Sequence, residues 1–250
     1  MDFRQQLLAQ IRQNIERSGR HLYAVGGGAS PPFFYTIGLY PKHGAELILA
    51  GGLGLPPGAA GHLLDAAARH LESLLKPEDF RFEYADCGCW GLRPVDPSWS
   101  ERLLLGAHDY WSKRVPAWQL IPEAEHKTID MPNLAVPFCV EPTWRFYEED
   151  WPHSVDPASP VLTHLAALRG PLIQQLVRWR PDFWEMYTDS AQEIDESQII
   201  HTPLGVLVAY DPTLTAAFDV PLGTGLYRSL DEPGKPGPWQ FWAPTPAPSN

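Results

Sequence analysis

The first residues of the sequence that could do chemistry are His43 and Glu46, which lie three positions apart. A histidine and a carboxylate can act together in acid–base chemistry on a bound substrate. Tyr35 and Thr36 lie shortly before them in an aromatic segment, and the four side chains would line a pocket if they converged. The structural alternative is that Glu46 accepts hydrogen bonds from loop amides while His43 packs over the end of a strand.

A second candidate is the tripeptide Cys87-Gly88-Cys89, which could offer two thiolates to a soft metal. A zinc site needs two more ligands at matching spacing, and nothing in the sequence places His108 or Cys139 beside the pair. Three cysteines are also too few for a disulfide framework. We therefore expect thiols without a metal, and no cofactor.

Two familiar patterns of phosphate binding and catalysis are missing. The glycine run Gly26–Ser30 is followed by Pro-Pro and a strand, whereas a phosphate loop needs a helix N-terminus there. No Gly-x-Ser-x-Gly elbow is present to expose a nucleophilic serine. The sequence therefore predicts no catalytic residues, and we expect that the protein is not an enzyme.

Partner contact is a further role that the sequence offers. Residues 148–150 form an acidic run that lacks the alternating ligands and the glycine of a calcium loop. A tryptophan follows this run directly, and two more lie in the turn-rich stretch 87–100. Surface carboxylates and tryptophans suit the binding of a basic protein. The expected contact residues are Glu148, Glu149, Asp150, Trp151, Trp90 and Trp99.

The composition narrows the class of partner. The chain has 250 residues and a formal net charge of −11. This acidity argues against nonspecific binding to nucleic acid or anionic membrane, because both need basic side chains. It fits a basic protein partner, and it would also serve solubility alone. No run approaches the roughly 20 apolar residues of a membrane span, and the N-terminus is unlike a signal peptide, so the expected compartment is the cytoplasm.

Hydrophobic spacing predicts a regular first half. Residues 2–17 repeat apolar side chains with helical period, and Gly19 is placed to end that helix. Three strands with short connections predict an antiparallel meander. The expected ranges are strands at 21–25, 33–40, 46–50, 81–85 and 118–121, and helices at 59–75 and 102–111.

Alternation along residues 33–40 predicts two different faces for that strand. Phe33, Tyr35, Ile37 and Leu39 share one face, which is apolar and expected to belong to the core. The opposite face carries smaller side chains, so a helix or a ligand could approach it closely.

The second half of the sequence begins after a proline-rich stretch. The proline-rich stretch 123–142 predicts a boundary between two modules. Beyond it we expect a strand at 143–147, a helix at 160–179, a strand at 205–210 and a helical turn at 212–218. The expected fold class is α+β, with an antiparallel or mixed sheet flanked by helices in two modules. The expected domains are residues 1–125 and 140–242, followed by a flexible tail at 243–250.

The segment PPFFYTIGLY at Pro31–Tyr40, followed by His43 and Glu46-Leu47, resembles the signature of the DUF4262 family. Members show an F-x-YTIGL core followed by H-P-E-L. This sequence has Gly44-Ala45 where the family has one proline. AWQLIP at 117–122 is similar to a second family segment, without its final Asp. The resemblance covers about residues 10–125, and it implies no activity because the family has none established.

Another segment, Tyr210–Arg228, is similar to the end of the DUF2185 or Imm33-like immunity domains. Their pattern begins with Y-D-P and ends with D-x-P-x-G-[ST] and an arginine. Trp144-Arg145-Phe146 also resembles the W-R-F of that domain, whereas the expected helix at 160–179 has no counterpart in it. The matching residues are Tyr210, Asp211, Pro212, Asp219, Pro221, Gly223, Thr224 and Arg228.

This second resemblance implies a bacterial binding protein. Such domains look like components of polymorphic-toxin and secretion-effector systems, where they bind and block a toxin made by the same cell. The resemblance therefore implies a cytoplasmic immunity protein that neutralises a cognate toxin or effector by protein–protein contact. The alternative is a small-ligand-binding protein or an enzyme that uses a pocket formed by Tyr35, Thr36, His43 and Glu46.

Overall fold

The structure is a computed structural model, and it describes residues 2–26, 28–74, 76–139, 141–188, 194–232 and 235–243. It has helices and two mixed six-stranded sheets, which confirms the predicted α+β class. The chain divides into two compact units, and each is described by itself. Unit 1 comprises Met1–Gly26, Pro32–Lys127 and Met131–Val140, and unit 2 comprises Gly27–Pro31, Thr128–Asp130 and Glu141–Asn250. Of the expected tail at 243–250, all but residue 243 lies outside the described residues.

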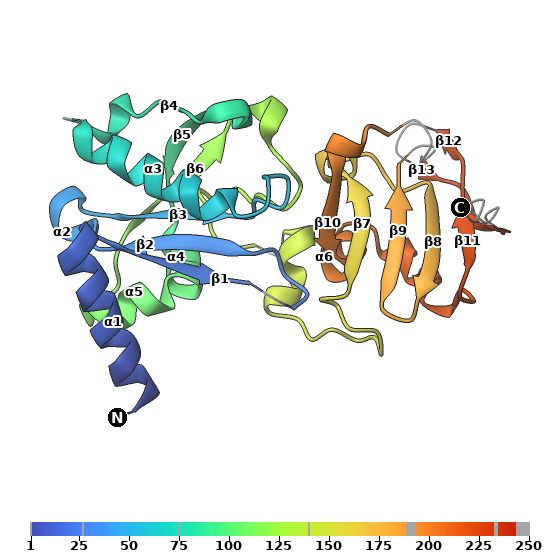
Figure 1. The fold of residues 1–250 in the computed structure, drawn as a ribbon, viewed down its shortest axis with the longest axis horizontal. Helices are drawn as coiled ribbons and strands as arrows, with labels where there is room; N and C mark the ends of the chain where they lie inside the picture. Colours follow the sequence, from blue (N-terminus) through green and yellow to red (C-terminus); the bar gives the residue numbers. More distant parts are fainter. Residues whose placement is uncertain are drawn as a thin grey trace, which may run out of the picture. The chain divides into compact units, whose positions relative to one another are not determined.

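Unit 1 is built on a sheet with the strand order β1-β2-β3-β6-β5-β4 (Figure 1). The first three strands pair antiparallel, which confirms the predicted meander, and β3 pairs parallel with β6. The strands are β1 (His21–Val25), β2 (Phe33–Ile37), β3 (Glu46–Ala50), β4 (Phe82–Glu83), β5 (Cys89–Pro94) and β6 (Ala117–Pro122). The α-helices are α1 (Phe3–Ser18), α2 (Tyr40–His43), α3 (Ala59–Ser73), α4 (Pro97–Leu103) and α5 (Leu105–Trp111), and 3-10 turns lie at Pro77–Asp79, Ala85–Cys87 and Ala124–His126.

The two faces of β2 pack against different helices. Tyr35 lies opposite Ile48 of β3, and its hydroxyl accepts a hydrogen bond of 3.0 Å from the backbone N–H of Gly106 in α5. Phe34 lies opposite Leu49 and packs against the cluster that contains α3. The face that the sequence left open to a helix or a ligand is therefore covered by α3.

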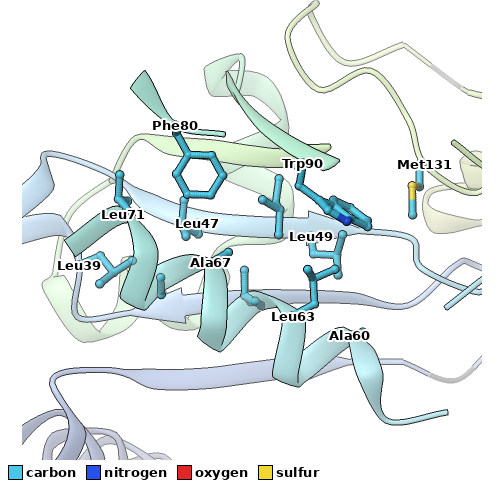
Figure 2. Close-up of a cluster of buried hydrophobic side chains, with 13 residues drawn as sticks. Leu39, Leu47, Leu49, Ala60, Leu63, Ala67, Leu71, Phe80, Trp90 and Met131 are labelled. Atoms are coloured by element: carbon cyan, nitrogen blue, oxygen red, sulfur yellow. The ribbon is translucent and has the colours of Figure 1, made fainter. Parts of the chain in front are cut away.

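An apolar cluster of unit 1 lies between α3 and the sheet (Figure 2). The apolar residues of α3 recur every three or four positions and so form one face of the helix. The strands supply alternate residues, and burial of each leucine contributes about 2 kcal/mol. The cluster consists of Leu39, Leu47, Leu49, Ala60, Leu63, Leu64, Ala67, Ala68, Leu71, Phe80, Trp90, Leu120 and Met131.

The strand β2 ends at Ile37, earlier than the sequence predicts, because the chain turns at Gly38. The φ of Gly38 is +136°, and a Cβ there would lie 2.7 Å from the backbone oxygen of Gly19 and 2.9 Å from the Cα of Arg20. The turn carries Leu39 into the α3 cluster, so Leu39 does not share the face of Tyr35 as expected.

Residues 87–111 also depart from the sequence-based expectation. The stretch expected to be turns contains β5 and the start of α4, whose N-terminus is capped by Asp96 through the backbone N–H of Ser98. The expected single helix at 102–111 is divided between α4 and α5. The two meet at Leu104, whose ψ of 37° lies outside the helical range.

Unit 2 is built on a second sheet with the order β10-β7-β9-β8-β11-β14, in which β7 and β9 are parallel (Figure 1). The strands are β7 (Pro160–His164), β8 (Gln175–Arg180), β9 (Phe183–Tyr187), β10 (Ile199–Pro203), β11 (Thr224–Tyr227) and β14 (Gln240–Trp242), and β12 (Leu230–Glu232) pairs with β13 (Lys235–Pro236). The helical segments are α6 (Leu204–Tyr210) and 3-10 stretches at Pro142–Tyr147, Leu165–Arg169, Glu196–Gln198 and Pro212–Asp219.

Three expected elements of unit 2 are wrong. The expected helix at 160–179 is the strand β7, a 3-10 turn and the strand β8, and the buried Val161 and Thr163 alternate as a strand requires. The expected strand at 143–147 lies in a 3-10 helix. The expected strand at 205–210 lies in α6, which is buried at every position from Leu204 to Ala209. A short run buried on all sides has no period that separates a helix from a strand.

A buried ion pair holds the C-terminal part of unit 2 together. The guanidinium of Arg228 donates to the carboxylate of Asp211, and both side chains are almost completely buried. Arg228 also donates to the carbonyl of Ile173 and the hydroxyl of Thr213, both at 2.7 Å, and lies 4.2 Å from the ring centre of Trp239. These contacts satisfy the guanidinium in a site from which water is excluded.

The loss of a carboxylate charge should cost far more stability at the buried ion pair than at an exposed one. Asp211→Asn should lower the free energy of unfolding by about 3–5 kcal/mol, because it leaves a buried guanidinium without its counter-charge. Asp109→Asn, which removes the exposed partner of Arg4, serves as the control and should leave the unfolding midpoint unchanged. Urea denaturation measures both, and equal effects of the two substitutions would contradict this account.

The close approach at Gly38 makes a second prediction. Gly38→Ala should destabilise the protein by about 3 kcal/mol or more, because backbone strain and a clash with backbone atoms each cost about 1–3 kcal/mol. The matched control is Gly44→Ala, at a φ of +75° with no atom within 4 Å of the added Cβ. It should cost only about 1 kcal/mol. Hydrogen exchange of the β1 and β2 amides measures how much each variant destabilises this part of the sheet.

Candidate functional site

The carboxylate of Glu46 is fully buried at the start of β3 and accepts five hydrogen bonds. The backbone N–H groups of residues 38–40 donate to it over 2.9–3.2 Å. The hydroxyl of Thr36 donates over 2.8 Å, and the indole N–H of Trp111 in α5 donates over 3.0 Å. Glu46 therefore fixes the turn after β2 and ties it to α5.

Burial changes the proton affinity of both titratable residues in this region. It raises the pKa of Glu46, because the charged carboxylate loses its hydration, and the hydrogen bonds oppose that rise without cancelling it. The imidazole of His43 lies at the end of α2, where burial and then the charge of Lys42 lower its pKa. Its Nε2 atom has no hydrogen-bond partner among the described residues.

Three of the four residues of the expected ligand pocket are occupied by structural contacts, and His43 is the exception. Tyr35, Thr36 and Glu46 are at most 1% exposed. Tyr35 stacks on Tyr23 at 5.1 Å between ring centres and binds α5 through its hydroxyl. The hydrogen bonds of Glu46 to the loop amides match the structural alternative raised by the sequence.

Cys87 and Cys89 of the tripeptide form no disulfide among the described residues. The sulfur of Cys89 accepts a hydrogen bond of 3.1 Å from Arg81, and this contact is the largest cause of a raised pKa at Arg81. Cys89 and Arg81 line an open depression of about 370 Å³ in unit 1. Within the described part of the chain, no three His, Cys, Asp or Glu side chains gather as metal ligands would.

Two tryptophans expected at a partner surface belong to the core. Trp90 is 1% exposed and lies in the α3 cluster, and Trp99 is completely buried in α4. Trp99 packs edge-to-face on Phe138, with ring centres 4.5 Å apart. Neither indole can contact a partner without unfolding its surroundings.

The acidic run and the tryptophan that follows it lie at the surface of unit 2. Glu148, Glu149 and Asp150 are exposed, and Arg145 pairs with Glu149 over 3.2 Å. Trp151 is half-buried, and its indole N–H donates to the carbonyl of Val155. This hydrogen bond holds the ring beside the acidic run.

Trp151 belongs to a cluster of aromatic rings that the fold assembles. Its ring centre lies 4.8 Å from that of His153, and His153 lies 5.1 Å from Phe218, with both pairs close to perpendicular. His153, Phe218 and Asp219 line an open depression of about 730 Å³, which we call the Phe218 depression. Its other lining residues are Pro152, Ser154, Thr213, Thr215 and Ala216.

Sequence reasoning identified Trp151 but not the depression beside it. His153 is only two residues away, and the composition there gives no reason to single it out. Phe218 and Asp219 lie at the end of the 3-10 helix Pro212–Asp219, far away in the sequence. Asp219 lies in the segment whose resemblance to immunity domains was the one available signal, but only the fold shows that it lines the same depression as His153.

The accessibility of the thiols makes a testable prediction. Cys139 is exposed, Cys87 is half-buried and Cys89 is buried. A bulky aromatic disulfide reagent should therefore label Cys139 first and Cys89 last in the native protein, and all three at similar rates in denaturant. Mass spectrometry of peptides after timed quenching checks this order. Rapid labelling of Cys89 in the native state would contradict the described packing.

The buried carboxylate makes a pH prediction. The folded-state pKa of Glu46 lies above its ordinary value of 4.5, so its stabilising contribution is complete below that value. The contribution is lost as the pH rises through the folded-state pKa. The difference in unfolding free energy between the wild type and Glu46→Gln should therefore fall as the pH rises from 4 towards neutrality. Urea titrations of both proteins at each pH measure it, and a difference that grows with pH would contradict the prediction.

Comparison with known proteins gives one match, which lies in the N-terminal half of the chain. Residues 14–128 match the model of the family described as "Domain of unknown function (DUF4262)", a range that contains Glu46 and its hydrogen-bond donors. No curated protein and no solved structure matches the chain. None of the described helices has the length and apolar character needed to cross a membrane. The N-terminal half of the chain, residues 14–128, is therefore similar to DUF4262 domains.

Proposed function

We propose that the protein is a bacterial immunity protein, which binds a basic toxin or secreted effector in the cytoplasm and blocks it by contact. The observation that carries this proposal is a surface of unit 2, where the exposed acidic run 148–150 is continuous with the aromatic cluster around Trp151. Aromatic rings supply contact area at low entropic cost, and carboxylates supply charge complementarity.

The carboxylate of Glu149 can exchange its present partner for a cation of another protein. Arg145 is the described partner of Glu149, and an exposed pair four residues apart is worth only about 0.3–0.5 kcal/mol. A cation from another protein can therefore replace Arg145 at little cost. The net charge of −11 adds a long-range attraction that would speed the encounter with a basic protein.

The similarity of residues 210–228 to immunity domains supports the same proposal. In that segment Asp211 and Arg228 form the buried ion pair, and Tyr210 donates a hydrogen bond of 2.9 Å to the carbonyl of Gly170. These residues hold unit 2 together. A partner would accordingly be recognised by the surface that they support, as expected of a binding protein without catalytic groups.

The proposal is tested with the product of the neighbouring gene. Co-expression of the wild type should restore growth that this product arrests, and the purified proteins should associate. The triple variant Glu148→Lys, Glu149→Lys and Asp150→Lys should lose the rescue and slow association at low salt by about tenfold or more. Growth curves and surface plasmon resonance measure the two effects.

The matched control changes the net charge equally at a distant place in the sequence. Glu78→Lys, Asp79→Lys and Glu83→Lys reverse three exposed carboxylates of unit 1. This control should keep the rescue, whereas a loss equal to that of the acidic-run variant would show that only the net charge matters. The proposal is wrong if the neighbouring product neither binds nor is neutralised.

A further inference from the structure

The Phe218 depression has the chemistry of a receptor for a positive charge. Phe218 and His153 line it with rings that are 71° apart in orientation, and Trp151 stands against both. The face of an aromatic ring carries partial negative charge, and it attracts a cation that lies over that face.

The polar groups of the lining point to the same ligand class. Asp219 is exposed at the depression and is its only carboxylate, and the described lining contains neither lysine nor arginine. The nearby guanidinium of Arg178 donates to the backbone carbonyls of Phe218, Val220 and Pro181. A carboxylate repels anionic ligands and pairs with a cation.

We infer that the Phe218 depression receives a single lysine or arginine side chain of the basic partner, with the charged head between the aromatic rings and Asp219. The volume of about 730 Å³ admits such a side chain together with the backbone that carries it. This inference rests on the proposed function for the nature of the partner. It goes further because it names one recognised side chain and the residues that select it.

The experiment compares two short blocked peptides, Gly-Gly-Arg-Gly-Gly and the same sequence with citrulline in place of arginine. Citrulline keeps the shape of arginine and lacks its charge. The arginine peptide should bind about tenfold more tightly and should shift the indole N–H resonance of Trp151 in the full-length, nitrogen-15-labelled protein. Equal affinity for the two peptides, or shifts confined to other residues, would overturn the inference.

Two substitutions locate the charge recognition. Asp219→Asn and Phe218→Leu should each lower the affinity for the arginine peptide about three- to tenfold. Neither should change the affinity for the citrulline peptide. Asp219 is exposed, so Asp219→Asn should fold normally even if Phe218→Leu does not. The control Glu196→Gln removes an exposed carboxylate of unit 2 that does not line the depression, and it should have no effect. Equal weakening by this control would contradict the assignment.

The result is separable from the test of the proposed function. If the arginine peptide binds at the depression and no neighbouring toxin is neutralised, the proposed function fails and the inference stands. If a toxin is neutralised equally well by Asp219→Asn and the wild type, the inference fails and the proposed function stands.

Discussion

Unit 1 depends on one buried carboxylate. Glu46 would be costly in a core without compensation, and the structure compensates it with five donors that come from β2, the turn after it and α5. The turn after β2, which Glu46 holds, places Gly38 against the backbone of Gly19 and Arg20. Only a glycine fits at this position. Thr36, Gly38 and Glu46, which belong to the segment that resembles the family signature, therefore take part in one hydrogen-bond network.

Unit 2 is also held together by buried charged groups, in this case the ion pair of Asp211 and Arg228. Asp211 caps a 3-10 helix through Thr213 and neutralises Arg228, and the arginine in turn binds the chain before β8. In both units the segments that are most recognisable in the sequence lie inside the molecule. Under the proposed function, a partner would be recognised by residues nearer the surface, such as Trp151 and Asp219.

The sequence predicted the elements whose pattern is local. The spacing of apolar residues was sufficient to predict α3, because that helix buries only one face. The alternation of side chains was sufficient to predict β1–β3, because the two faces of these strands have different surroundings. The prediction of element type was wrong at 160–179 and 205–210. Side chains there are buried on several sides, so the apolar residues show no helical or strand period. The prediction was also wrong for Trp90 and Trp99, since turn residues nearby do not reveal which rings are enclosed. The Phe218 depression could not be predicted, because its walls meet only through the tertiary fold.

The parallel pairing of β3 with β6 carries a consequence for how unit 1 forms. Glu46 lies opposite Ala117, and the chain between these partners contains α3, β4, β5, α4 and α5. A long loop must close before this pairing contributes any free energy, whereas the hairpins β1-β2 and β2-β3 need only short ones. We infer that the meander assembles early and that β6 docks after the main kinetic barrier. Substitutions at Trp118 or Gln119 would then accelerate unfolding while leaving the folding rate nearly constant.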